Sequence, residues 1–463
     1  MSVGIVGGGV SGLALHHHLR ERGVASVVFE ADDEPGGVIR STRTDGRVLE
    51  RGPQRTRLTP VVEDLVEAVG LKKELRTANE DGPLYVYRDG DLRVAPRSPR
   101  EAVTTSLFSL SGKLRALAEP LTGPPRDGET VRSYFRRSFG REVADNYLAP
   151  LYAGLYASDP AAMPVEHSAA KALTKTGPTD SVLVNVVHGA LYGTAPPPVV
   201  SFDAGLQRLP EALAECHAES VRLSTPVCDL RDEDNGDGGA FVFETAAGET
   251  ERFDRVVVTT PAGAASGLLS SIAPDAADRL DRLTFNPMAV VHLLADSDGG
   301  FDADSDTSDA SRGTPTGAGF QVPHDEPLHT LGTTWNASLL DRDGVYTAYL
   351  GGAKNPALLD WPDDRIETTA ADEFEAVTGL PVDPLSVARL VPGMPAYDTS
   401  WAALEGLETP DGVHLCTNYV ARAGIPGRVR AARDLAERLA AETTTADAGT
   451  GRNRPSVASG TAG

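Results

Sequence analysis

The chain has 463 residues, with 66 acidic and 43 basic side chains and a formal net charge of −23 at pH 7. This length accommodates two or three domains with ample cores, and the charge argues against general nucleic-acid binding because a phosphate backbone would be repelled. Only six of the basic residues are lysines. An acid-rich, lysine-poor surface is tolerated where salt screens self-repulsion, so we predict a halophilic source.

The three cysteines, Cys216, Cys228 and Cys416, are far apart and form no CxxC pattern. They indicate neither a disulfide framework nor a zinc site, and we expect no metal ion. No signal peptide precedes the first predicted strand, and the sequence has no run of about 18 apolar residues that could span a membrane. We therefore expect a cytoplasmic protein.

The first thirty residues predict a dinucleotide site. An apolar run, a GxGxxG turn, a helical period and a second apolar run form a strand, a helix and a strand. Gly7 permits the tight turn, Gly9 lets the backbone approach a pyrophosphate, and Gly12 lets the helix pack closely. The helix N-terminus adds free N–H groups and a positive dipole end. The candidate contacts are Gly7, Gly8, Gly9, Val10, Ser11 and Gly12. The alternative is a glycine-rich turn with no ligand.

The second apolar run ends at Glu30, which lies 23 positions after Gly7. This is close to the spacing of about 20 residues expected for the acid that binds the ribose hydroxyls of a dinucleotide. An acid at this place disfavours a 2′-phosphate. Glu30 is therefore a further candidate contact.

Three consecutive histidines, His16, His17 and His18, lie in the intervening helix. Consecutive helical residues point about 100° apart, so the three side chains cannot converge on one ion. We interpret them as part of a half-exposed helix.

Two glycine-containing pairs, Gly36-Gly37 and Gly52-Pro53, follow Glu30. They bring the backbone beside the nucleotide again, which suits a long cofactor such as FAD better than a compact NAD site. These residues resemble the FAD-binding signature of the flavin amine oxidase superfamily, in which paired glycines and a Glu-x-Gly-Pro segment follow the first βαβ unit. The resemblance implies FAD as the cofactor. It adds the candidate contacts Gly37, Val38, Arg40, Gly52, Pro53 and Gln54.

The chain becomes basic after two regular elements. Residues 59–69 predict an amphipathic helix, and residues 84–94 a hairpin that turns at Asp89-Gly90. Residues 93–141 then contain ten basic and four acidic side chains. We consider two interpretations. The basic stretch is either a solvated helical face paired with acidic loops, or a patch that attracts a carboxylate-bearing substrate, a membrane surface or a partner enzyme.

Residues 149–160 narrow the family. Their pattern predicts a helix stop at Pro150 and then small residues that allow the close approach of a ligand. The segment is similar to one that protoporphyrinogen and coproporphyrinogen oxidases carry along the substrate cavity, usually Ser-Gly-(Ile/Val)-Tyr-Ala-Gly-Asp-Pro. The resemblance assigns Gly154 and Tyr156 to the substrate cavity. Ala153 and Ser158 depart from the pattern.

Two later segments match the same family. Residues 221–230 are predicted to form one strand, and the resemblance places Val227 at the adenine end of FAD. Residues 253–261 predict a buried strand of the nucleotide domain. Near the end, a strand, a loop and a helix N-terminus form an anion-accepting geometry. There the resemblance assigns cofactor contacts to Asn418, Ala423, Gly424 and Ile425. Thr417 and Arg422 replace the usual glycines of this segment, and Gly427 replaces the usual Asp.

The resemblance and the order of the predicted elements imply an α/β fold. A Rossmann-type FAD-binding domain is interleaved with a mixed-sheet substrate domain and a helical subdomain. We assign residues 1–80, 200–265 and 405–441 to the FAD-binding domain, 81–95 and 266–404 to the substrate domain sheet, and 96–199 to the helical subdomain. Residues 442–463 are predicted to be a disordered tail. The cleft between the two sheets is the expected site of cofactor and substrate.

The resemblance implies FAD-dependent oxidation of a porphyrinogen, a tetrapyrrole, to the porphyrin, with oxygen or another acceptor reoxidising the flavin. The pyrroles already activate the C–H bonds, so we name no catalytic base. Leu84 and Gln54 stand where arginines are common in enzymes that act on the dicarboxylate, which favours coproporphyrinogen III over protoporphyrinogen IX. We predict that Arg93 or Arg97 binds a substrate carboxylate. The alternatives are a carotenoid desaturase or amine oxidase of the same superfamily, and a GDI-like protein that binds a partner without catalysis.

Overall fold

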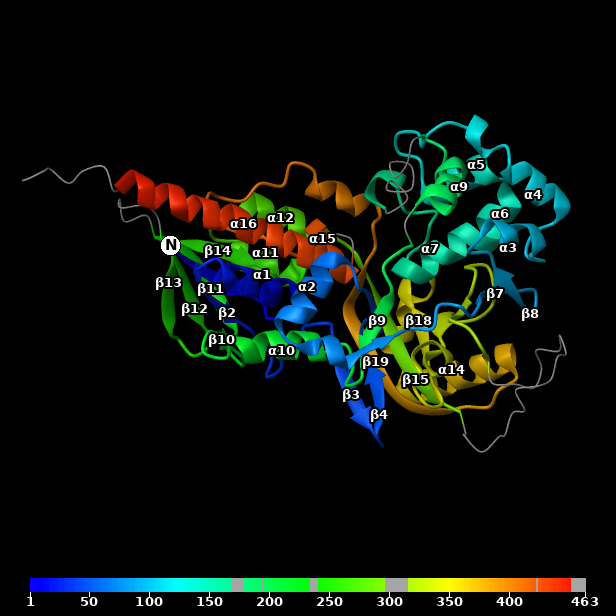
Figure 1. Cartoon of the computed structure of the whole chain (residues 1–463), viewed down its shortest axis with the longest axis horizontal. Helices are drawn as coiled ribbons and strands as arrows, with labels where there is room; N and C mark the ends of the chain where they lie inside the picture. The colour runs from blue at the N-terminus through cyan, green and yellow to red at the C-terminus, as the bar shows by residue number, and fades with distance from the viewer. Residues whose placement is uncertain (169–178, 194, 234–239, 296–314, 422–423, 451–463) are drawn as a thin grey trace, which may run out of the picture.

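The computed structural model describes residues 1–168, 179–193, 195–233, 240–295, 315–421 and 424–450. Figure 1 shows one sheet with long helices near the N-terminus, a second sheet beside it, and a group of short helices above the second sheet. The α/β fold that we expected is confirmed. No helix within the described ranges is both long and apolar enough to cross a membrane.

The first sheet has five parallel strands in the order β10-β2-β1-β14-β20. Its strands are β1 (Ser2–Val6), β2 (Ala25–Phe29), β10 (Val221–Arg222), β14 (Arg255–Val258) and β20 (Val413–Leu415). Four helices share an apolar core with one face of this sheet: α1 (Val10–Glu21), α2 (Pro60–Ala68), α10 (Arg208–Cys216) and α16 (Gly424–Thr450). The other face packs against β11 (Val227–Glu233), β12 (Ala240–Thr245), β13 (Thr250–Phe253), α11 (Ala262–Leu269) and α12 (Pro274–Asp281).

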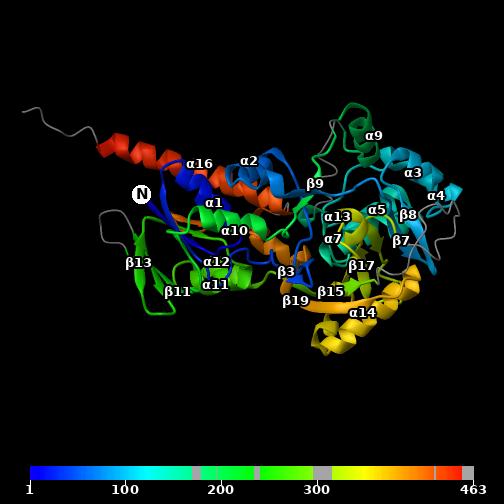
Figure 2. The same ribbon diagram turned by 60° about the horizontal axis from the view of Figure 1, so that its bottom comes forward.

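The second sheet has seven strands in the order β19-β15-β18-β17-β16-β7-β8. They are β7 (Leu84–Arg88), β8 (Asp91–Ala95), β15 (Phe285–Leu294), β16 (Gly319–Gln321), β17 (Thr330–Thr334), β18 (Val345–Gly351) and β19 (Asp383–Pro395). Only the pairing of β7 with β16 is parallel among these described strands, so the sheet is mixed. Helix α14 (Asp363–Thr378) covers one face, as Figure 2 shows. Helix α7 (Ala149–Tyr156) contacts β16 and β17 on the opposite face.

Short strands and two helices lie outside the two large sheets. They comprise the hairpin β3 (Ser41–Thr44) with β4 (Arg47–Glu50), the sheet of β5 (Thr56–Arg57), β9 (Val199–Phe202) and β6 (Leu75–Thr77), the helix α2 (Pro60–Ala68), and α13 (Asn336–Leu340). Helices α2, α3 (Pro99–Thr104), α4 (Leu110–Ala116), α5 (Val131–Phe139), α6 (Arg141–Val143), α7 (Ala149–Tyr156), α9 (Val182–Tyr192) and α15 (Asn418–Ala421) complete the larger elements. The predicted helix at 59–69 and the hairpin at 84–94 are confirmed.

Four local predictions were wrong, two described here and two in the next paragraph, each with its own physical reason. Residues 221–230 form two strands in different sheets, since positive φ at Ser224 breaks the run. Pro150 does not stop a helix: it lies in the first turn of α7, after a π-helical turn at Ala144–Leu148, where its missing N–H is tolerated.

The histidine helix is not half-exposed. His16, His17 and His18 are all buried, because α10 and α16 enclose α1. The last helix also extends into the segment that we predicted to be a disordered tail. α16 continues past Ala441 to Thr450, since no proline and no glycine before Gly449 interrupts the sequence. The rest of the predicted tail, 451–463, lies outside the described residues.

Candidate functional site

The carboxyl edge of the parallel sheet gathers the predicted cofactor residues. All five strands end at this edge because they run in the same direction. Helix α1 follows β1, α11 follows β14, and α15 and α16 follow β20. Their N-termini therefore lie near one edge of the sheet, where α/β folds bind nucleotides.

The glycine turn after β1 meets the second glycine pair here. Gly9 forms a β-bridge with Gly36, and the Gly36 N–H donates to the Gly8 carbonyl at 2.9 Å. A Cβ on Gly9 would meet only the Gly36 carbonyl oxygen, at 3.8 Å, and a Cβ on Gly37 would lie 3.6 Å from the Gly9 Cα. Two motifs 27 positions apart thus form one bare backbone surface. It provides the close approach that a pyrophosphate needs.

Gly12 serves the packing of α1. A Cβ there would lie 2.0 Å from the Gly7 carbonyl oxygen, so only glycine lets the helix start this close to the turn. Gly7 itself has φ +111°, a value that side chains rarely adopt. Val10 and Ser11, in the same first turn, are buried.

Glu30 lies at the carboxyl end of β2 and is buried. Its two carboxylate oxygens accept hydrogen bonds from the Gly8 N–H and the Asp32 N–H. The Glu30 carbonyl accepts from the Thr225 N–H at 2.7 Å. This bond brings the segment that leads into Val227 beside Glu30, and contact of Val227 with the adenine end stays a prediction.

The residues between Val38 and Gln54 are brought together, but their side chains are engaged elsewhere. A Cβ on Gly52 would lie 1.9 Å from the Val38 carbonyl oxygen, so these two segments touch through their backbones. Arg40 forms ion pairs with Asp32 and Glu34 at 2.7 and 2.8 Å. Gln54 is buried and bonded within the protein, and Pro53 joins it to Gly52. Cofactor contact by these residues stays a prediction.

The end of the chain closes the site. Asn418 begins α15, Gly424 begins α16 with φ +61°, and Ile425 is buried in the core against α1. Ala423 and Arg422 lie outside the described residues. The polar atoms Thr260 Oγ1 and Arg428 Nε are buried without a hydrogen-bond partner in the described part of the chain. Burial also lowers the pKa of Arg428.

These features fit FAD. The bare glycine surface would hold the pyrophosphate, and Glu30 would hold the ribose. Thr260 and Arg428 offer unsatisfied donors at the same edge. Our sequence analysis did not identify Thr260 or Arg428. The position of Thr260 directly after a parallel strand was a usable signal, because ligands bind beyond the carboxyl ends of such strands.

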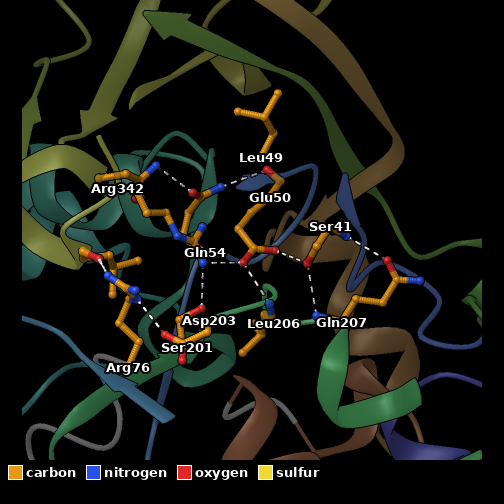
Figure 3. Close-up of polar contacts among 12 residues, drawn as sticks. Ser41, Leu49, Glu50, Gln54, Arg76, Ser201, Asp203, Leu206, Gln207 and Arg342 are labelled. Atoms are coloured by element: carbon orange, nitrogen blue, oxygen red, sulfur yellow. Dashed lines mark hydrogen bonds and ion pairs between the residues drawn. The ribbon is translucent and has the colours of Figure 1, made fainter. Parts of the chain in front are cut away.

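A buried ion pair joins the nucleotide domain to the second sheet (Figure 3). Arg342 Nη2 lies 2.9 Å from Glu50 Oε1 and 3.0 Å from Ser201 Oγ. Glu50 also accepts hydrogen bonds from Ser41 Oγ and from the Leu206 N–H. Burial raises the pKa of Glu50, while Arg342 and these donors oppose the rise. The pair connects the end of β4 to the loop before β18, and no pattern in the sequence predicted it.

His292 adds a pH-sensitive contact beside this pair. Its Nε2 lies 2.9 Å from the Glu50 carbonyl oxygen, which only accepts, so Nε2 carries the proton and donates. Nδ1 then accepts from Ser386 Oγ at 3.0 Å. Burial, reinforced by the charges of Arg342 and Arg51, lowers the pKa of His292 from 6.5 to about 4. The folded state therefore holds His292 neutral.

We expect the protein to lose stability on acidification through this histidine. Because the folded pKa lies below the unfolded value, the contribution is complete above pH 6.5 and is lost as the pH falls toward about 4. The loss should reach about 3 kcal/mol, since one pKa unit corresponds to about 1.4 kcal/mol. Urea unfolding of the wild type and of His292→Gln at pH 7, 5.5 and 4.5 measures it. His188→Gln, an exposed control on α9, should follow the wild type; an unchanged pH slope in His292→Gln would contradict the assignment.

The predicted substrate residues occupy two different places. Gly154 on α7 abuts Gln321, whose Oε1 would be 1.5 Å from a Cβ on the glycine and has no hydrogen-bond partner in the described part. Tyr156 packs edge-on against Tyr397, with ring centroids 5.1 Å apart, and burial raises its pKa. Helix α7 thus contacts the face of the second sheet opposite α14.

Arg93 and Arg97 lie at the outer edge of the sheet. Arg93 is 3.6 Å from Asp89 and 4.0 Å from Asp91 on its own hairpin. The Arg97 side chain donates to the Gly82 carbonyl. Among the residues that the structure describes, no hydrogen bond or ion pair joins either arginine to Gly154 or Tyr156. Their role in substrate binding stays a prediction.

The basic stretch 93–141 is partly neutralised by acids within it and just after it. Arg132 and Arg136 both pair with Asp145, and Arg137 pairs with Glu129. Several leucines of the same stretch are nevertheless exposed, notably Leu114 and Leu121. Contact of this surface with a membrane or a partner enzyme stays a prediction.

Metal chemistry has no visible site in the described ranges: no three His, Cys, Asp or Glu side chains there are placed to hold an ion. The histidines of α1 are bonded separately. His16 contacts Ser26 and Ser220, and His17 contacts His217.

Comparison with known proteins identifies the family. Residues 10–440 match the family described as flavin containing amine oxidoreductase. The chain belongs to this family. The protein is therefore an FAD-dependent oxidoreductase, and the bare glycine surface at the carboxyl edge of its parallel sheet fits this cofactor.

Relatives of this flavin amine oxidoreductase include named tetrapyrrole enzymes. It is 25% identical over 441 residues to protoporphyrinogen oxidase 2 of Arabidopsis thaliana, covering 86% of this chain and 85% of that protein. It is 26% identical over 428 residues to coproporphyrinogen III oxidase of Bacillus subtilis, covering 85% and 87%. A crystal structure from Exiguobacterium sp. 255-15, named as a candidate protoporphyrinogen oxidase, shares the fold with a TM-score of 0.76, 23% identity and coverage of 95% and 99%.

Proposed function

We propose that this flavoprotein oxidises a porphyrinogen, either coproporphyrinogen III or protoporphyrinogen IX, to the porphyrin. The observation that carries the proposal is the similarity to relatives of both names over most of their length. The placement of α7 supports it, because Gly154 lies against Gln321 on the sheet face opposite α14, and Tyr156 packs against Tyr397 just beyond the end of β19. Oxygen or another acceptor would reoxidise the flavin.

The bound flavin supplies the electron sink for removal of hydrides from the porphyrinogen. The residues of this chain position the reactants. The glycine surface and Glu30 would hold the nucleotide half of FAD, and the ion pair of Glu50 with Arg342 would keep the second sheet in register with that half. Aromatic side chains such as Tyr156 and Tyr397 would exclude water from the reacting face. We assign no acid–base residue.

The experiment is a side-by-side oxidation assay. Purified protein with its bound flavin is incubated with coproporphyrinogen III and with protoporphyrinogen IX, and porphyrin fluorescence is followed. We expect porphyrin from at least one substrate, at a rate above that of an enzyme-free blank, with coproporphyrinogen III preferred. A primary amine such as benzylamine serves as a control and should release no hydrogen peroxide. Amine oxidation without porphyrin formation would favour the amine oxidase alternative and overturn the proposal.

A further inference from the structure

Arg55 lies where the nucleotide domain meets the second sheet. It follows Gln54 and precedes β5. The Gln54 amide oxygen accepts from Asn336 Nδ2 at 3.0 Å and from Thr347 Oγ1 at 3.4 Å. Because Thr347 belongs to β18, these bonds hold Gln54, the residue before Arg55, against the seven-stranded sheet.

Gln54, the residue before Arg55, contacts the sheet surface opposite α14 through Thr347. Tyr349 is two residues from Thr347 on β18, so the two side chains share a face. Thr334 pairs with Thr347 across β17 and β18, and its Oγ1 lies 3.4 Å from the Tyr349 hydroxyl. Tyr349 and Arg55 interact electrostatically. The same face carries Gln321, the side chain that abuts Gly154.

The charge of Arg55 has no partner within the described residues. No ion pair or hydrogen bond joins its guanidinium to another group there. The acid whose charge raises the pKa of Arg55, Glu80, pairs with Arg57 at 3.3 Å and accepts from the Val199 N–H. Burial lowers the pKa of Arg55, although the residue keeps some accessible surface. Burying an unpaired cation is costly, so an anion is expected beside it.

We propose that Arg55 binds a carboxylate of the substrate on the face of the second sheet that carries Tyr349 and Gln321. A guanidinium binds carboxylates through two parallel hydrogen bonds, and a neighbouring phenol can donate a third. The inference rests on the proposed function, because porphyrinogens carry propionate groups. It replaces Arg93 and Arg97, whose charges already have partners at the sheet edge. A phosphate of the cofactor is the other anion that could occupy this place.

Product binding tests the inference without relying on turnover. Coproporphyrin III, with four carboxylates, and its uncharged tetramethyl ester are titrated in matched detergent into the flavin-loaded protein, and quenching of tryptophan fluorescence gives both affinities. In Arg55→Met we expect binding of the acid to weaken about tenfold or more, the effect of losing a charge-assisted hydrogen bond. Binding of the ester should change less than about twofold. Arg55→Lys should lie between wild type and Arg55→Met. Arg57→Met, which removes the neighbouring surface arginine, should match the wild type.

The outcomes distinguish the role of Arg55 from the proposed oxidation of a porphyrinogen. Equal binding of the acid by wild type, Arg55→Met and Arg55→Lys overturns the role of Arg55 and leaves the proposed function standing. Loss of bound flavin from folded Arg55→Met, seen in the visible absorbance, assigns the cation to the cofactor and also overturns it. Failure of the wild type to bind either porphyrin and to oxidise either porphyrinogen rejects the proposed function instead. If Arg55→Met does not fold by circular dichroism, Arg55→Lys decides alone.

Discussion

Replacing Arg342 with methionine should lower the free energy of unfolding by about 3–5 kcal/mol, because it leaves a buried carboxylate without its counter-ion. The side chains of Arg342 and Glu50 are 6% and 0% exposed, and their closest atoms are 2.9 Å apart. The two residues are 292 positions apart. The pair therefore connects β4 of the nucleotide domain to the loop before β18, and its loss should destabilise the contact between the two domains.

Urea unfolding of Arg342→Met and of the double variant Glu50→Gln/Arg342→Met measures this effect. The double variant should recover part of the stability, since it no longer buries a charge. Arg20→Met is the matched control. Arg20 pairs with Glu219 at 3.3 Å, but both side chains are exposed, 39% and 64%, so its loss should cost less than about 1 kcal/mol. If Arg342→Met costs no more than Arg20→Met, the buried pair does not hold the sheets together.

Local patterns predicted the backbone features of the glycine turns and the position of Glu30, while contact of these residues with FAD stays a prediction. The turn after β1, the acid at Glu30 and the pair Gly36-Gly37 each require a backbone conformation or a close approach that only certain residues allow. Such requirements are written into a few consecutive residues. The structure accordingly brings Gly9 and Gly36 together and sets Glu30 beside the turn.

Properties that depend on distant partners could not be predicted. The burial of His16 depends on α10 and α16, and α16 begins at Gly424, more than 400 positions later in the chain. The partner of Glu50 lies in a loop of the other domain. Arg93 pairs with Asp89 on its own hairpin. Arg55 forms no such ion pair within the described residues, because Glu80 already pairs with Arg57. Which arginine carries an unbalanced charge is decided by tertiary packing.

The second large predicted effect is a loss of FAD affinity on substitution in the glycine surface formed by Gly9 and Gly36. Changing Gly9 to alanine should leave the fold intact and yet lower the affinity for FAD by about a hundredfold or more, since a methyl group would stand where the pyrophosphate must approach. The protein itself has room for the change: Gly9 has φ −73°, and its Cβ would meet only the Gly36 carbonyl oxygen at 3.8 Å. Flavin content after dialysis, the dissociation constant for FAD and the melting temperature of the flavin-free protein are the measurements.

Two other glycines separate binding from packing. Gly12→Ala places its Cβ 2.0 Å from the Gly7 carbonyl oxygen, so it should lower the stability of the flavin-free protein as well as FAD binding. Gly267→Ala, in helix α11 with no atom within 4 Å of its Cβ, should keep FAD and gain up to about 1 kcal/mol from better helix propensity. A Gly9→Ala protein that retains FAD as firmly as Gly267→Ala would show that the pyrophosphate does not rest on this turn, and the cofactor would then have to be placed elsewhere along the sheet edge.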